Sequence, residues 1–127
     1  MPRRPPVSDA ELEVLKELWT LGPATVRDVG AALRRRRRRL AYNTVLTLLS
    51  RLRDKGYVEV DRREPAHLFR ASVTRDELLG SSLSALAERV CDGTASPLVL
   101  ALVRNQRFSA KEIAHLRKLL DDLTPKD

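Results

Sequence analysis

The stretch AYNTVLTLLSRLRDKG, residues 41–56, decides the fold of this chain. Its apolar residues recur at the spacing of one helix face, i, i+3, i+4 and i+7, and are Val45, Leu48, Leu49 and Leu52. The opposite face carries mostly short hydrogen-bonding side chains: Asn43, Thr44, Thr47, Ser50, Arg51 and Asp54. Gly56 suits the position just after a helix, where a left-handed backbone is common. We therefore predict an amphipathic helix that ends near Gly56.

The polar face of this predicted helix has two interpretations. Short donors and acceptors near a helix N-terminus, surrounded by positive charge, suit a helix that enters the DNA major groove and contacts base edges. An ordinary solvent-exposed helix is the alternative, although such faces usually carry the Glu and Lys that favour helix more than Thr does. The stretch alone does not decide between the two interpretations, so the flanking sequence must.

The net charge of +7 is unevenly distributed along the 127 residues. Residues 1–73 contain 16 Lys+Arg against 9 Asp+Glu, whereas residues 74–127 contain 8 of each. A basic segment joined to a neutral one indicates a polyanion-binding domain over 1–73 and a domain with another role over 74–127.

Composition narrows the class of protein. Hydrophobic residues make up 43% of the chain and aromatic residues only 4%, so the core must consist mainly of Leu, Val and Ala. The chain has no apolar run of ~18 residues and no signal-peptide pattern, and its single cysteine, Cys91, cannot form an internal disulfide. We therefore expect a cytoplasmic protein with no membrane partner.

Two helices are predicted before the opening stretch. The first spans about 9–21, begins with a capping box of Ser8 and Glu11, buries Trp19 with its leucine stripe, and ends at Gly22. The second begins after Thr25 and is expected to extend into the arginine run that follows. Residues 1–7 are expected to form a mobile, solvated arm.

Residues 34–39 are six consecutive arginines. A solvated charged loop is one interpretation of such a run. Its position just before the predicted DNA-contacting helix favours the other, which is contact with DNA phosphates by Arg38 and Arg39.

A β-hairpin is predicted after the opening stretch. Residues 57–61 and 67–71 partly alternate apolar and polar side chains, and a five-residue loop containing Pro65 separates them. A basic hairpin after a helix-turn-helix predicts a winged helix, with Arg62 and Arg63 on the DNA backbone. His67 is a weaker candidate, because a lone histidine is more often a plain surface residue.

The segment 74–127 predicts three further helices, with capping boxes that begin at Thr74 and Ser109. About 50 residues make a small core, so its apolar stripes must pack on the first domain or on a second copy of the chain. The second copy is favoured, because DNA-binding proteins of this kind commonly dimerise on two half-sites. The candidate dimerisation residues are Leu79, Leu83, Leu86, Leu98, Leu102, Ile113, Leu116, Leu120 and Leu123.

No catalytic, nucleotide-binding or metal-binding motif is found in the sequence. His67 and His115 lack metal-ligand spacing to each other or to Cys91, which we expect to be a small packed residue. The sequence therefore predicts neither an enzyme nor a bound cofactor or metal.

The sequence resembles the penicillinase-repressor family of bacterial transcription regulators (the BlaI/MecI/CopY group). The most specific part is NTVLTLLSRL at 43–52 with Lys55 and Gly56, which is similar to the family pattern T-V-x-T-L-L-x-R-L-x-x-K-G. The segment 11–19, the LVL at 98–100 and the SAKE at 109–112 also fit. The resemblance implies a winged-helix domain, a helical dimerisation domain, and a homodimer that represses transcription from a palindromic operator.

The candidate DNA-contacting residues follow from these arguments together. They are Tyr42, Asn43, Thr44, Thr47 and Arg51 on the helix, Arg38 and Arg39 before it, and Arg62 and Arg63 on the hairpin. A winged-helix protein-interaction module and a non-specific nucleoid-type DNA binder are the alternative functions.

The chain departs from the family pattern in three places. Antibiotic-responsive members are cut by a protease at an Asn-Phe bond, and the matching positions here are Ala101 and Leu102. Copper-responsive members carry a cysteine pair near the C-terminus, where this chain has none. The six-arginine run is not part of the family pattern either. Neither an inactivating protease nor a small-molecule signal is therefore identified by the sequence.

Overall fold

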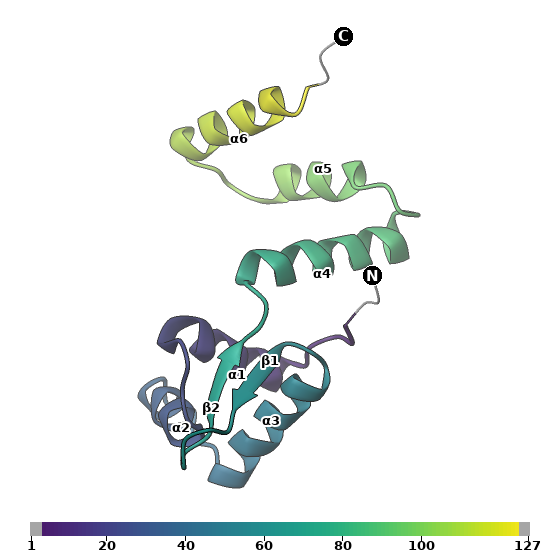
Figure 1. Cartoon of the computed structure of the whole chain (residues 1–127). Coiled ribbons are helices and arrows are strands. Elements are labelled where there is room, and N and C mark those ends of the chain that lie inside the picture. Colours follow the sequence, from purple (N-terminus) through teal and green to yellow (C-terminus); the bar gives the residue numbers. More distant parts are fainter. Residues whose placement is uncertain (1–3, 125–127) are drawn as a thin grey trace. The chain divides into compact units, whose positions relative to one another are not determined.

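The structure, a computed structural model, describes residues 4–124. In that range the chain forms six helices and a two-stranded sheet (Figure 1), namely α1 (Asp9–Leu21), α2 (Val26–Arg35), α3 (Tyr42–Asp54), β1 (Val58–Asp61), β2 (Leu68–Ala71), α4 (Arg75–Val90), α5 (Ser96–Asn105) and α6 (Ala110–Asp122). The prediction of a mainly helical, winged-helix fold with one small hairpin is confirmed. The chain divides into two compact units, one ending at Gly80 and one beginning at Ser81.

Local hydrogen bonds explain where the helices begin. The Ser8 hydroxyl accepts from the Glu11 N–H at 3.2 Å, and the Glu11 carboxylate accepts from the Ser8 N–H at 2.8 Å. The same reciprocal pair starts α2 with Thr25 and Asp28, and α6 with Ser109 and Glu112. Each box satisfies two backbone groups that a helix end leaves open, so these predicted starts are confirmed.

The core of the first unit lies between α1, α2 and α3. Val45, Leu49 and Leu52 of α3 are at most 1% exposed. They belong to one apolar cluster with Leu15 and Leu18 of α1, Val29 and Leu33 of α2, and Val58 and Phe69 of the hairpin. The apolar face predicted for residues 41–56 is therefore buried, which fixes the opposite face of α3 toward solvent.

The hairpin is tied to the helices by a backbone bridge. β1 and β2 pair antiparallel from Val58 opposite Ala71 to Asp61 opposite Leu68. Ala24, in the connection between α1 and α2, exchanges two backbone hydrogen bonds with Phe69 of β2, at 2.9 and 2.8 Å. The loop spans 62–67, one residue longer than predicted, because His67 is outside the strand.

The described part of the N-terminal arm is not a free, solvated segment, so that prediction is wrong for residues 4–7. Arg4 Nε donates to the Gly56 carbonyl at 3.0 Å, and the Tyr57 hydroxyl donates to the Pro5 carbonyl at 2.6 Å. Lys55 Nζ donates to the Pro6 carbonyl at 2.8 Å. These bonds hold the arm against the end of α3, a tertiary contact that composition does not reveal. Residues 1–3 of the predicted arm lie outside the described residues.

The second helix enters the arginine run and ends within it. α2 includes Arg34 and Arg35, and Arg36 is its C-cap. Arg37 has a φ of 62°, in the left-handed region. Its N–H donates to the Arg34 carbonyl, and the Arg38 N–H donates to the Leu33 carbonyl, both at 2.9 Å. This pair of bonds is the Schellman motif that commonly ends a helix.

The first turn of α4 belongs to the first unit. Trp19 Nε1 donates to the Val73 carbonyl at 2.8 Å, and the Arg75 guanidinium lies over the Trp19 ring, 5.4 Å from its centroid. Leu78 packs against the core. The contact boundary at Gly80 thus lies beyond residue 73, and the functional division into 1–73 and 74–127 stays a prediction.

The second unit buries little of its apolar surface. Between residues 81 and 124, Ala87 alone is buried, and α5 and α6 contain no buried residue. Ile113 and Leu116 are each 39% exposed, and Leu120 is 61% exposed. Of the nine predicted dimerisation residues, Leu98 is half-buried and the others are exposed. Among the described residues, no helix is both long enough and apolar enough to span a membrane.

Candidate nucleic-acid interface

The outer face of α3 brings the predicted base-contacting residues together. Tyr42 is 55% exposed, and Asn43, Thr44, Thr47 and Arg51 are also exposed. A shallow, open depression of about 290 Å³ is lined by Asn43, Thr44, Thr47, Leu48 and Arg51. Because Val45 and Leu49 hold the inner face in the core, these polar side chains have no route inward and must face solvent or a ligand.

The hydroxyl of Thr47 is already used as a donor. Its Oγ1 donates to the Asn43 carbonyl at 2.8 Å, one turn back along α3. The oxygen keeps lone pairs that accept hydrogen bonds, so in this rotamer Thr47 pairs with a donor rather than an acceptor. In the DNA major groove such donors are the amino groups of adenine and cytosine.

The N-terminus of α3 is open. Its N-cap residue is Ala41, and no side chain among the described residues caps it. The N–H groups of Tyr42, Asn43 and Thr44 therefore have no intrahelical acceptor. A helix end of this kind, together with the helix dipole, favours a bound anion such as a phosphate.

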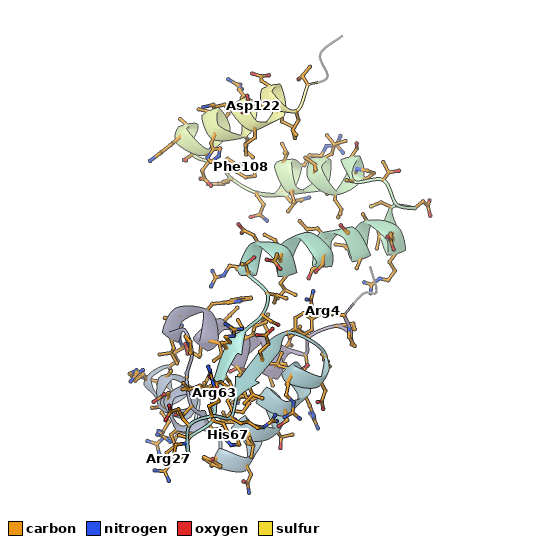
Figure 2. The ribbon with its side chains drawn as sticks, in the orientation of Figure 1. Arg4, Arg27, Arg63, His67, Phe108 and Asp122 are labelled. Carbon is orange, nitrogen blue, oxygen red and sulfur yellow. The ribbon has the colours of Figure 1, made fainter. Side chains whose placement is uncertain are left out.

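The two wing arginines differ in their environment. Arg62 is exposed and has no partner in the part of the chain that the structure describes. Arg63 Nη2 lies 2.7 Å from Asp61 Oδ2, and hydrogen bonds from Arg63, mainly from its side chain, lower the pKa of Asp61 to about 2. The Arg63 charge is thus partly compensated, which leaves Arg62 as the stronger cation. His67 is exposed at the end of the same loop (Figure 2).

Arg27 is a further cation that the sequence analysis missed. It is exposed on the first turn of α2 and has no described partner (Figure 2). Figure 2 labels it at the same end of the first unit as Arg63 and His67. It is isolated in the sequence, where Asp28 follows it, so no charge cluster marked it in advance.

The two arginines predicted before α3 are not equivalent. Arg38 Nε donates to Glu13 Oε2 of α1 at 3.0 Å, with side chains 49% and 39% exposed. Arg39 is exposed, and no described residue pairs with it. The prediction that both contact phosphate is untested, but only Arg39 is free to do so without breaking an ion pair.

A buried ion pair joins the start of α1 to the end of α3. Glu11 is 1% exposed, and its Oε1 accepts from Lys55 Nζ at 2.6 Å. Burial opposes ionisation and is the largest influence on the pKa of Glu11, yet the hydrogen bonds from Lys55 and Ser8 together outweigh it and lower that pKa. Glu11 Oε2 is buried with no hydrogen-bond partner. The sequence predicted Glu11 only as a capping residue, because a local pattern does not report a partner 44 residues away.

Comparison with known proteins decides the family. A family model described as penicillinase repressor matches residues 7–122 of this chain. The chain belongs to the penicillinase repressor family. It is similar to the transcriptional regulator BlaI of Mycobacterium tuberculosis, at 38% identity over 119 residues, which are 92% of this chain and 84% of that protein. The penicillinase repressor of Staphylococcus aureus is 22% identical over 94% of each chain.

This membership makes the chain a transcriptional repressor with a winged helix, not an enzyme. Among solved structures, it resembles a MarR family protein from Bacillus stearothermophilus, with a TM-score of 0.47 and 22% identity over 94% of this chain and 74% of that one. Wild-type MarR from E. coli in its apo form gives a TM-score of 0.45 and 21% identity, over 94% and 79%. Likenesses this weak carry no argument about function.

Proposed function

We propose that this repressor acts in the cytoplasm as a homodimer that binds a palindromic DNA operator, with α3 of each copy in the major groove. One observation carries the proposal. The outer face of α3 combines small polar side chains, Asn43, Thr44 and Thr47, with Arg51, and its inner face is locked in the core. A rigidly held helix with short polar groups near its N-terminus is the arrangement that reads base edges.

Each residue on this surface has a chemical role in the proposal. The Asn43 amide donates to and accepts from an adenine, and Thr44 and Thr47 accept from amino groups of bases. Arg51 binds a guanine or a phosphate, and Tyr42 with the open N–H groups of α3 binds the backbone beside the groove. Arg39 and Arg62 contact phosphates on either side, because both are exposed and unpaired in the described part of the chain.

Dimerisation is supported by the apolar side chains of α4, α5 and α6. They recur at helical spacing, and most are more than a third exposed: Leu79, Leu83, Leu86, Leu102, Ile113, Leu116, Leu120 and Leu123. Exposed apolar stripes on a small helical unit favour a partner that removes them from water, at roughly 25 cal/mol per Å² buried. A second copy is the proposed partner, since a two-fold dimer matches a palindromic site.

Selection of bound sequences from a random duplex pool, using the purified full chain, tests the proposal. We expect a palindrome with half-sites about one helical turn apart. Binding without a preferred sequence would favour the non-specific alternative. No duplex binding even at low salt would favour the protein-interaction module.

Two threonine variants sharpen this test. Thr47→Ala should weaken binding to the selected operator by ~1–3 kcal/mol, about 5- to 150-fold, and leave binding to random duplex unchanged. Thr20→Ala is a matched control, because Thr20 of α1 is also exposed and its hydroxyl also donates to a carbonyl one turn back, Lys16, at 3.2 Å. We expect that control to bind both duplexes like the parent. Equal losses on operator and random DNA for Thr47→Ala would contradict a base-contacting role.

A further inference from the structure

The six arginines at 34–39 fall into two groups. Arg36 and Arg38 form ion pairs with carboxylates of α1. Arg34, Arg35, Arg37 and Arg39 are exposed, and no ion pair joins them to any residue between 4 and 124. In the turn that leads to α3, paired and free arginines therefore alternate along the chain.

The two paired arginines attach this turn to α1. Arg36 Nε donates to both carboxylate oxygens of Glu17, at 3.0 and 2.9 Å, and the Glu17 side chain is only 4% exposed. Arg38 Nε donates to Glu13, which lies one turn before Glu17 on the same face of α1. A nearly buried carboxylate that lost Arg36 would keep its charge without a partner, so Arg36 is held in place by the folded protein.

Arg37 occupies a position that folding alone would give to another residue. It is the left-handed residue of the Schellman motif, with a φ of 62°. Glycine is the usual residue there, because a Cβ atom disfavours the left-handed region. The Arg37 side chain is exposed and makes no described contact that compensates for this strain. Stability therefore does not explain an arginine at this position, whereas a ligand for its charge would.

We propose that Arg37 and Arg39 bind DNA phosphates independently of sequence, whereas Arg36 and Arg38 hold the turn against α1 and do not bind DNA. This inference rests on the proposed function and divides the run that a sequence treats as uniform. The fixed turn presents the two free guanidinium groups just before the open N-terminus of α3. Each phosphate contact releases condensed counterions, so it appears in the salt dependence of binding.

The test compares three neighbouring single substitutions that remove the same charge, namely Arg37→Gln, Arg38→Gln and Arg39→Gln. Each variant, as the full chain, is titrated with a random-sequence 24-base-pair duplex at several salt concentrations from 50 to 200 mM. We expect Arg37→Gln and Arg39→Gln each to reduce the slope of log K against log salt by about 0.9. Arg38→Gln should keep the parent slope, although it removes an equal charge one residue away.

Thermal unfolding provides the second measurement. Arg38→Gln should lower the melting temperature slightly, because it breaks the pair with Glu13, while Arg39→Gln should leave it unchanged. Equal slope losses in all three variants would overturn the division, since Arg38 would then leave Glu13 for a phosphate. Unchanged slopes in Arg37→Gln and Arg39→Gln would overturn the phosphate contacts. A parent chain that binds no duplex at low salt would instead refute the proposed function itself.

Discussion

Removal of the Lys55 ammonium by Lys55→Met should destabilise the first unit by about 3 kcal/mol at pH 7. Glu11 is 1% exposed, and loss of one partner from a fully buried ion pair costs about 3–5 kcal/mol. The Lys55 side chain is 27% exposed, so water reaches the site and reduces that contribution to about 2 kcal/mol. The lost hydrogen bond to the Pro6 carbonyl adds about 1 kcal/mol.

The pH dependence of this loss follows from the pKa of Glu11. In the parent, burial opposes ionisation of Glu11, but hydrogen bonds from Lys55 and Ser8 hold its pKa below the model value of 4.5. The lowered pKa contributes stability above about pH 4.5, and this contribution is lost as the pH falls through the folded pKa. Without Lys55, burial dominates and the pKa of Glu11 rises. The difference in unfolding free energy between parent and variant should therefore shrink from pH 7 toward pH 4.5.

Urea unfolding followed by Trp19 fluorescence measures this difference, because Trp19 is the single tryptophan and lies in the first unit. Arg53→Met is the matched control, since Arg53 pairs with the exposed Asp54 at 3.3 Å, and it should change stability by less than about 0.5 kcal/mol. Combined with Glu11→Gln, Lys55→Met should cost much less than it does alone. A loss below about 1 kcal/mol at pH 7, or an equal loss at pH 7 and pH 5, would refute the reasoning.

Three further predictions concern other parts of the chain. Arg37→Gly should raise the unfolding free energy by about 1 kcal/mol in the same urea assay, because it removes strain at a φ of 62°; a lower stability would contradict the Schellman assignment. Leu49→Ala should lower that free energy by about 2–5 kcal/mol, because Leu49 is fully buried between the helices of the first unit. A change below about 1 kcal/mol would place Leu49 outside the core. Leu116→Glu should shift the chain from dimer to monomer in sedimentation equilibrium, whereas Lys118→Glu, on the same helix, should not. An unchanged dimer in Leu116→Glu would remove this stripe from the proposed interface.

Short-range patterns in the sequence predicted most of the secondary structure. The capping boxes at Ser8, Thr25 and Ser109 lie where predicted, because a capping box joins residues only three apart. The apolar stripe of residues 41–56 predicted which face of α3 is buried. Since the stripe and the polar face are opposite sides of one helix, the sequence also predicted that Asn43, Thr44 and Thr47 share an exposed surface.

The charged residues were the part that only the tertiary structure decided. Nothing local distinguishes Arg38 from Arg39, yet the fold places one against Glu13 and leaves the other free. Glu11 is a helix-capping residue in the sequence, and its burial depends on Lys55, 44 residues later. A charge takes its environment from whichever groups the fold brings within a few ångströms, and those groups are set by packing between helices rather than by neighbours along the chain.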